Sequence, residues 1–270
     1  MSRVHQALQR AGGTFVTGTA HAFQAPLDDF LSEVPSVPDQ LSPDALMLDP
    51  LNPAAAPSEE FRALRTRLNH MQSRQPIRTV VITSASPAEG KSFTATNLAL
   101  AQAQLSGNRV LLCDFDLRRP AIHKFFQMDR GPGITDYLLG KVALPHALRR
   151  IGDSNLYVMP AGEAVINPLE LLNLPEAKQL FARVSATFHW TLIDTPPLLF
   201  AADGNLLATL CDATILVVRI GETTIDSVAR ARQALCQDNV IGIVVNGARR
   251  GELYNKYTYY NSYADATRAG

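Results

Sequence analysis

Six apolar runs, separated by stretches of helical periodicity, set the pattern of this chain from residue 79 onward. Most are nearly continuous, such as Val110-Leu111-Leu112-Cys113 and Ala213-Thr214-Ile215-Leu216-Val217-Val218, and such runs are typical of parallel strands buried on both faces. The pattern predicts strands over 79–84, 109–114, 155–159, 190–194, 213–219 and 240–246, and helices over 93–106, 168–188, 203–210 and 223–238. This alternation predicts an α/β fold with a doubly wound, mainly parallel sheet, and a ligand site at the carboxyl ends of its strands.

Both ends of the chain depart from this pattern. Residues 1–57 hold 7 of the 17 prolines and show no sustained periodicity, which predicts a Pro-rich flexible segment with an extended linker from Pro35 to Pro57. After Asn246 the chain becomes polar and aromatic. Because a core strand would alternate with Val or Ile, we expect residues 248–270 to form an exposed tyrosine-rich tail behind a central domain over 58–247.

The central domain opens on an amphipathic helix. Its apolar stripe consists of Phe61, Leu64, Leu68 and Met71, the spacing of one helical face. Charged residues recur beside this stripe at every third position, namely Glu59, Arg62 and Arg65. Taken alone, this flank is typical of the solvated side of a surface helix.

A phosphate-binding loop follows the strand over 79–83. It reads Ser84-Ala85-Ser86-Pro87-Ala88-Glu89-Gly90-Lys91-Ser92, with Ala85 where the usual pattern has its first glycine. Backbone N–H groups of such a loop and of the next helix converge on phosphates, the lysine reaches the β- and γ-phosphates, and the serine hydroxyl can bind Mg²⁺. The loop therefore predicts a P-loop NTPase domain that binds a nucleoside triphosphate with Mg²⁺, through Ser86, Pro87, Ala88, Glu89, Gly90, Lys91, Ser92 and Phe93.

Three acidic residues end two of the predicted strands. Asp114 and Asp116 follow one apolar run, and Asp194 follows another in Thr191-Leu192-Ile193-Asp194-Thr195-Pro196-Pro197. Parallel strands deliver their carboxyl ends to the same edge as the phosphate loop. We expect Asp194 and Asp114 to act beside Mg²⁺, which takes one or two carboxylates, and Asp116 to orient or deprotonate an incoming hydroxyl.

The roles of four further residues stay open on sequence. Arg118 and Arg119 could neutralise developing charge or bind an acidic neighbour, or they could form surface salt bridges. Asn246 could hydrogen-bond a base edge, or serve as an ordinary turn residue before Gly247. Asp203 is predicted to cap the helix that follows it rather than to assist the metal.

Composition narrows the class of protein. The 25 basic residues equal the 25 acidic ones, so nothing draws the chain to nucleic acid or to a lipid surface. Three cysteines without a CxxC pair fit a reducing cytoplasm. No run approaches the roughly 20 apolar residues of a membrane span, so direct membrane insertion is not expected.

Taken together and in order, these motifs resemble the bacterial tyrosine kinases (BY-kinases) of capsule and exopolysaccharide export. The resemblance covers most of residues 58–263, and the loop resembles the Walker A motif of that family. The other matching motifs are Glu59-x-x-Arg62-x-x-Arg65, the second Walker motif (A′) Asp114 to Pro120, Gly133 to Gly140, Pro160-Ala161-Gly162 with Asn167-Pro168-x-Glu170-Leu171-Leu172, the Walker B motif Leu192 to Pro197, and the terminal tyrosines.

The resemblance implies an ATP- and Mg²⁺-dependent autokinase. It implies that Lys91 holds phosphates, that Ser92, Asp114 and Asp194 bind the metal, and that Lys91, Asp114 and Asp116 serve catalysis. It further implies an octameric homo-oligomeric ring in which each tail enters a neighbour's site, with Glu59, Arg62 and Arg65 at the interface. The phosphorylated residues would be Tyr254, Tyr257, Tyr259, Tyr260 and Tyr263.

The resemblance also implies a partner and a location. Kinases of this family are fused to, or activated by, a membrane-spanning polysaccharide co-polymerase. Without a span of its own, this chain resembles a stand-alone cytoplasmic kinase that reaches the inner membrane through a separate partner and regulates polymer assembly and export.

Two other functions compete with this one. An ATPase of the ParA/MinD type shares the fold and the strand-end acids, but it carries an extra lysine early in the loop where this chain has Ser86, and it has no use for a tyrosine tail. An ATP-dependent assembly switch, with incidental phosphorylation, would use the same residues.

Overall fold

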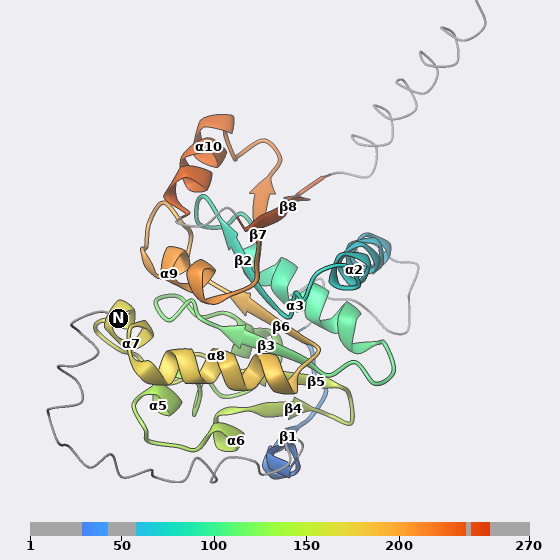
Figure 1. Cartoon of the computed structure of the whole chain (residues 1–270), viewed down its shortest axis with the longest axis vertical. Helices are drawn as coiled ribbons and strands as arrows, with labels where there is room; N and C mark the ends of the chain where they lie inside the picture. The colour runs from blue at the N-terminus through green and yellow to red at the C-terminus, as the bar shows by residue number, and fades with distance from the viewer. Residues whose placement is uncertain (1–28, 43–57, 236–238, 249–270) are drawn as a thin grey trace, which may run out of the picture.

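An eight-stranded sheet forms the centre of the computed structural model, which describes residues 29–42, 58–235 and 239–248 (Figure 1). The strand order is β1-β4-β5-β3-β6-β2-β7-β8, and every neighbouring pair is parallel except β4 and β5. The strands are β1 Ser36–Val37, β2 Thr79–Ser84, β3 Val110–Asp114, β4 Arg149–Ile151, β5 Leu156–Met159, β6 Trp190–Asp194, β7 Ala213–Arg219 and β8 Val240–Asn246. The predicted α/β fold and all six predicted strands are confirmed.

Helices connect the strands and cover both faces of the sheet. They are the 3₁₀ helix η1 Asp29–Glu33 and the α-helices α2 Ser58–Gln72, α3 Lys91–Ala103, α4 Ile122–Phe125, α5 Ile134–Leu138, α6 Leu144–Ala147, α7 Pro168–Leu172, α8 Pro175–Thr187, α9 Asp203–Leu210 and α10 Ile225–Ala234. The single helix predicted over 168–188 is wrong, because Pro175 disfavours helical backbone at Leu174. Leu174 is extended, and α8 starts immediately after it.

Alternate residues of the central strands pack into two separate cores. On one face, Val110 and Leu112 of β3 join a cluster with Phe61 of α2 and Leu98 of α3. On the other face, Leu111 and Cys113 join α5, α6, α7 and α8. Figure 1 shows α2 and α3 side by side, with α8 across the opposite face. Because both faces of the strands are buried, near-continuous apolar runs are the expected sequence pattern.

Part of the N-terminal region belongs to the sheet. β1 pairs in parallel with β4, Val34 is buried in one core, and Ser42 N–H donates to the Phe125 carbonyl at 2.8 Å. The extended linker predicted from Pro35 is therefore wrong for residues 35–42. A two-residue strand and one buried Val carry too little periodicity to be recognised in a Pro-rich sequence.

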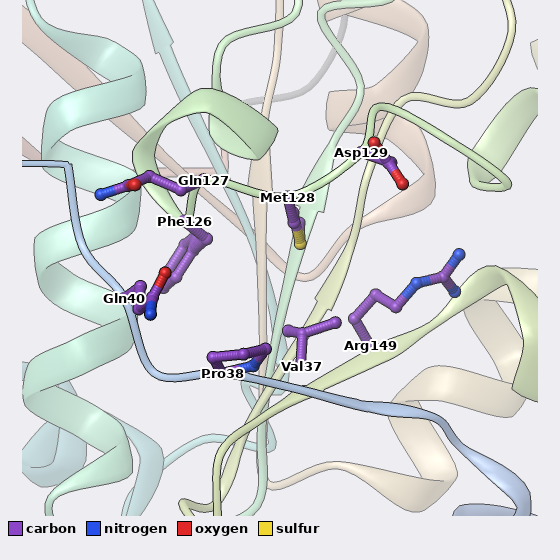
Figure 2. A pocket seen from close by; sticks show the side chains of 8 residues that line it. All are labelled: Val37, Pro38, Gln40, Phe126, Gln127, Met128, Asp129 and Arg149. Atoms are coloured by element: carbon purple, nitrogen blue, oxygen red, sulfur yellow. The ribbon is translucent and has the colours of Figure 1, made fainter.

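A small cavity of about 210 Å³ lies where this segment crosses the domain. Figure 2 shows Val37, Pro38 and Gln40 on one side of it, with residues 126–129, which follow α4, and Arg149 of β4 on the other. Residues 1–28 and 43–57 lie outside the described residues, and so does the predicted tail beyond residue 248. Within the described ranges, no helix combines the length and the apolar character that a bilayer crossing requires.

Candidate nucleotide-binding site

The predicted phosphate loop joins β2 to α3. Its backbone enters the left-handed region twice, at Ala88 with φ of 63° and at Gly90 with φ of 94°. Gly90 is required for a second reason, because a Cβ there would lie 1.8 Å from Nδ2 of Asn246. Helix α3 begins at Lys91, so its first N–H groups and the positive end of its dipole face the loop. The loop thus has the geometry of a phosphate cradle.

Lys91 lies against Asp116 at the mouth of this cradle. The Nζ–Oδ2 distance is 2.9 Å, and both side chains are largely buried. Burial lowers the pKa of Lys91, but the carboxylates of Asp194, Asp116 and Asp114 raise it more, and the net pKa is above its ordinary value. Lys91 is therefore a permanent cation within reach of three acidic side chains.

Asp114 and Asp194 are buried neighbours on adjacent strands. They are paired in register between β3 and β6. Asp114 Oδ2 accepts from the N–H groups of Ala121 and Ile122 at 3.0 Å, while its Oδ1 and both oxygens of Asp194 have no hydrogen-bond partner. Burial, followed by repulsion from nearby carboxylates, raises the pKa of Asp114. Burial also raises the pKa of Asp194, against the opposing effect of the Lys91 charge.

These unpartnered oxygens fit a hard divalent cation. A buried carboxylate without a donor is costly, and Mg²⁺ relieves that cost with one or two carboxylates, a hydroxyl and phosphate oxygens. Asp194 and Ser92 supply the first two kinds of ligand. Within the described ranges, no three His, Cys, Asp or Glu side chains form a metal cage.

Replacing Asp194 by Asn is expected to stabilise the metal-free protein. The variant removes a buried charge, and its amide faces neighbouring carboxylates that can accept. Because the folded-state pKa of Asp194 is raised above the ordinary value of about 3.9, its ionisation costs the parent stability as pH rises above about 4; the variant lacks this part of the loss and keeps the part that comes from Asp114. We expect a gain of about 1–3 kcal/mol at neutral pH, measured by urea unfolding in EDTA. A gain that persists unchanged at pH 4 would contradict this account, and so would a loss at neutral pH.

The structure shows contacts of two predicted site residues, Asn246 and Phe93, that the sequence did not indicate. Asn246 donates from Nδ2 to the Glu89 carbonyl at 3.0 Å, so it braces the loop, and its contact with a base stays a prediction. The Phe93 ring packs edge-on against Phe61 of α2, with ring centroids 6.0 Å apart. Its contact with ATP stays a prediction.

Asp203 is not a helix cap, which corrects the sequence prediction. Its Oδ2 accepts from Nε of Arg118 at 2.9 Å, and the residue is buried within the first turn of α9. The open choice for Arg118 is thereby narrowed to an ion pair with Asp203. This pair ties the loop after β3 to α9, close to the strand-end acids.

The charged flank of α2 is partly used inside the subunit. Arg65 donates to the Ala101 carbonyl of α3 at 2.8 Å, and Arg62 lies 3.5 Å from Glu59, which is exposed. Arg65 thus fastens α2 to α3, while Glu59 faces solvent. The proposed subunit interface stays a prediction, and the five tail tyrosines lie outside the described residues.

Two residues that the sequence did not single out reach the loop. Arg219 donates from Nη1 to the Ala88 carbonyl at 2.9 Å, and the Thr223 hydroxyl donates to Glu89. They lie more than 130 positions from the loop. No local motif marks them, because an Arg at the end of a strand and a Thr in the following turn are common.

Fold and site together define a nucleotide-binding P-loop domain. Residues 80–261 match the family model described as the CobQ/CobB/MinD/ParA nucleotide binding domain. A MinD structure from Pyrococcus horikoshii has a TM-score of 0.55 at 20% identity, which shows the shared fold alone.

Closer relatives define the family within this class. The chain is 35% identical over 212 residues to tyrosine-protein kinase YwqD of Bacillus subtilis, covering 78% of this chain and 89% of YwqD. It is 33% identical to tyrosine-protein kinase etk of Escherichia coli, over 73% of this chain and 27% of etk. The solved kinase domain of Escherichia coli ETK has a TM-score of 0.72 at 32% identity, covering 76% of this chain and 82% of that one. This chain belongs to the bacterial tyrosine kinases.

The relatives differ in extent. The chain spans most of YwqD but only about a quarter of etk and of tyrosine-protein kinase ptk of Acinetobacter johnsonii. The activities of the longer proteins as a whole can therefore be extended to this chain only as a proposal.

Proposed function

We propose that this chain transfers the γ-phosphoryl group of ATP to tyrosines of its own C-terminal cluster. The observation that carries the proposal is the group of buried acids around Lys91. Asp116 lies on Lys91 at 2.9 Å, and Asp194 presents two buried oxygens without partners. Phosphoryl transfer needs positioning and charge neutralisation more than covalent chemistry, and this group offers both.

Lys91 and Asp116 divide the work of the transfer. In the nucleotide-free protein each neutralises the other. When phosphates occupy the loop, Lys91 exchanges Asp116 for phosphate oxygens, which frees the Asp116 carboxylate to accept the proton of an incoming tyrosine hydroxyl. Loop N–H groups and the α3 N-terminus hold the β- and γ-phosphates in place.

Ser92, Asp194 and Oδ1 of Asp114 are the proposed metal-side groups. Mg²⁺ held by these groups would supply positive charge that neutralises the phosphoryl group during transfer. Asp114 also fixes the loop before α4 through its second oxygen. The Asp114 carboxylate thereby connects the proposed metal site with the backbone segment that contains Asp116.

Assembly and regulation complete the proposal. An octameric ring would use Glu59, Arg62 and Arg65 at its interface and present each tail to a neighbour. A separate membrane-spanning co-polymerase would activate the kinase and bring it to the inner membrane, where its phosphorylation state would regulate exopolysaccharide or capsule assembly and export. The solvent-exposed carboxylate of Glu59 supports the interface role.

The tyrosine cluster can be tested directly. Replacing Tyr254, Tyr257, Tyr259, Tyr260 and Tyr263 together by Phe should remove most phosphotyrosine from the chain while leaving ATP binding unchanged, because Phe keeps the ring and removes only the hydroxyl that accepts the phosphoryl group. The measurement is mass spectrometry of the full chain purified from its own host, where any activating partner is present, with nucleotide titration in parallel.

The same variant separates the kinase from an assembly switch. Tail tyrosines without phosphate in the parent chain would overturn the proposal. Normal polymer length in cells carrying the five-Phe variant would favour the switch, because assembly rather than phosphorylation would then control export.

A further inference from the structure

The phosphate loop contains a residue in an unfavourable backbone conformation. Ala88 has φ of 63°, a left-handed geometry that residues with a Cβ rarely adopt. The neighbouring left-handed residue is Gly90, which carries no such cost. A strained conformation persists only where surrounding groups hold it, so the contacts around Ala88 decide the shape of the loop.

A buried carboxylate holds the loop from within. Glu89 is only 2% exposed. Its Oε2 accepts from the Ser86 N–H at 2.8 Å, and its Oε1 accepts from the Thr223 hydroxyl. Thr223 is fixed in turn, because its hydroxyl also accepts from the Arg219 N–H at 2.8 Å.

A guanidinium holds the loop from outside. Nη1 of Arg219 donates to the carbonyl of Ala88 at 2.9 Å, and its Nε lies 3.0 Å from Glu222. The strained residue and the one after it are thus each bonded to the turn between β7 and α10. Both bonds come from outside the phosphate loop and its motif.

We propose that the turn from Arg219 to Thr223 sets nucleotide affinity by holding the loop in its left-handed conformation at Ala88. Arg219 and Thr223 are positioning residues, since neither lies on the loop itself. The inference rests on the proposed ATP site but not on tyrosine transfer. It also makes this exposed turn a place where an effector could change nucleotide binding.

The strain offers a specific test. If Thr223 and Arg219 act by holding Ala88, a glycine at that position should make them dispensable, because glycine adopts the same φ without cost. Thr223→Val should weaken binding of a fluorescent N-methylanthraniloyl ADP about 3- to 10-fold, and Arg219→Met should act similarly. Adding Ala88→Gly to either variant should restore affinity to within about 2-fold of the parent.

Matched variants separate positioning from general damage. Thr223→Ser keeps the hydroxyl and should bind as the parent does. Thr209→Val removes a hydroxyl bond of 2.7 Å to the Leu206 carbonyl within α9 and should leave affinity unchanged. Urea unfolding of each variant identifies any that is not folded.

Two results would overturn the inference. One is unchanged affinity in folded Thr223→Val and Arg219→Met. The other is an equal loss of affinity with and without the added Ala88→Gly change, because the bonds would then act through something other than the strained residue. The measured quantity is the affinity for a nucleoside diphosphate. If the chain binds nucleotide but does not phosphorylate tyrosine, these affinities should still change as expected.

Discussion

Replacing Lys91 by Met is expected to abolish tyrosine phosphorylation of the chain, by about 10³-fold or more. The methionine keeps most of the length of the side chain but removes the cation that lies 2.9 Å from Asp116. Two losses combine. The phosphates lose their lysine contact. Asp114, Asp116 and Asp194 lose the positive charge that offsets the repulsion among their carboxylates. The measurement is phosphotyrosine by quantitative mass spectrometry after incubation with ATP and MgCl₂.

The control for this variant is Lys178→Met. Lys178 is exposed on α8, so the same chemical change there should alter neither phosphorylation nor stability appreciably. Lys91→Met should also lower the free energy of unfolding in the absence of Mg²⁺, because buried carboxylates lose their compensating charge. Phosphorylation of the Lys91→Met chain at the parent's rate would show that the phosphoryl donor does not occupy this loop.

Replacing Asp116 by Asn should separate transfer from binding. We expect the transfer rate to fall about 10²- to 10⁴-fold, since the amide cannot accept the tyrosine proton. Nucleotide affinity should stay the same or improve, because Asp116 competes with phosphate for Lys91 in the free protein. Single-turnover phosphorylation and nucleotide titration report the two quantities separately.

The outcome for Asp116→Asn distinguishes two roles. Equal losses of transfer and of nucleotide binding would assign Asp116 to the metal rather than to the hydroxyl. Asp153→Asn, in the exposed turn between β4 and β5, makes the same chemical change away from the site and should leave both quantities unchanged.

The central strands were predictable to within a residue because both of their faces are buried. In β3 and β7 every position but the last is apolar or small. These strands can therefore be recognised without an alternation of apolar and polar residues. β4 was missed for the opposite reason. Its Arg149-Arg150-Ile151 sequence has one buried position of three, and its pairing with β1 and β5 supplies order that its own residues do not specify.

The residues of the site that end a strand were predictable, because the end of each parallel strand has a known place at the edge of the sheet. Asp114 and Asp194 end adjacent parallel strands, so the fold brings them together in register. The partner of Asp203 was not predictable in this way. Arg118 reaches it from 85 positions away, and an acid at the start of a helix more often serves the helix itself.

Asn246 gives the tail a mechanical connection to the nucleotide loop. It ends β8, bonds the Glu89 carbonyl, and lies eight residues before Tyr254. The opposite sheet edge is β1, seven strand spacings or about 34 Å away at about 4.8 Å each. Chain that enters the sheet at β1 is therefore far from Asn246, whereas the tail begins two residues after the side chain that bonds the loop. A pull on the tail would reach the phosphate loop through the Asn246 side chain.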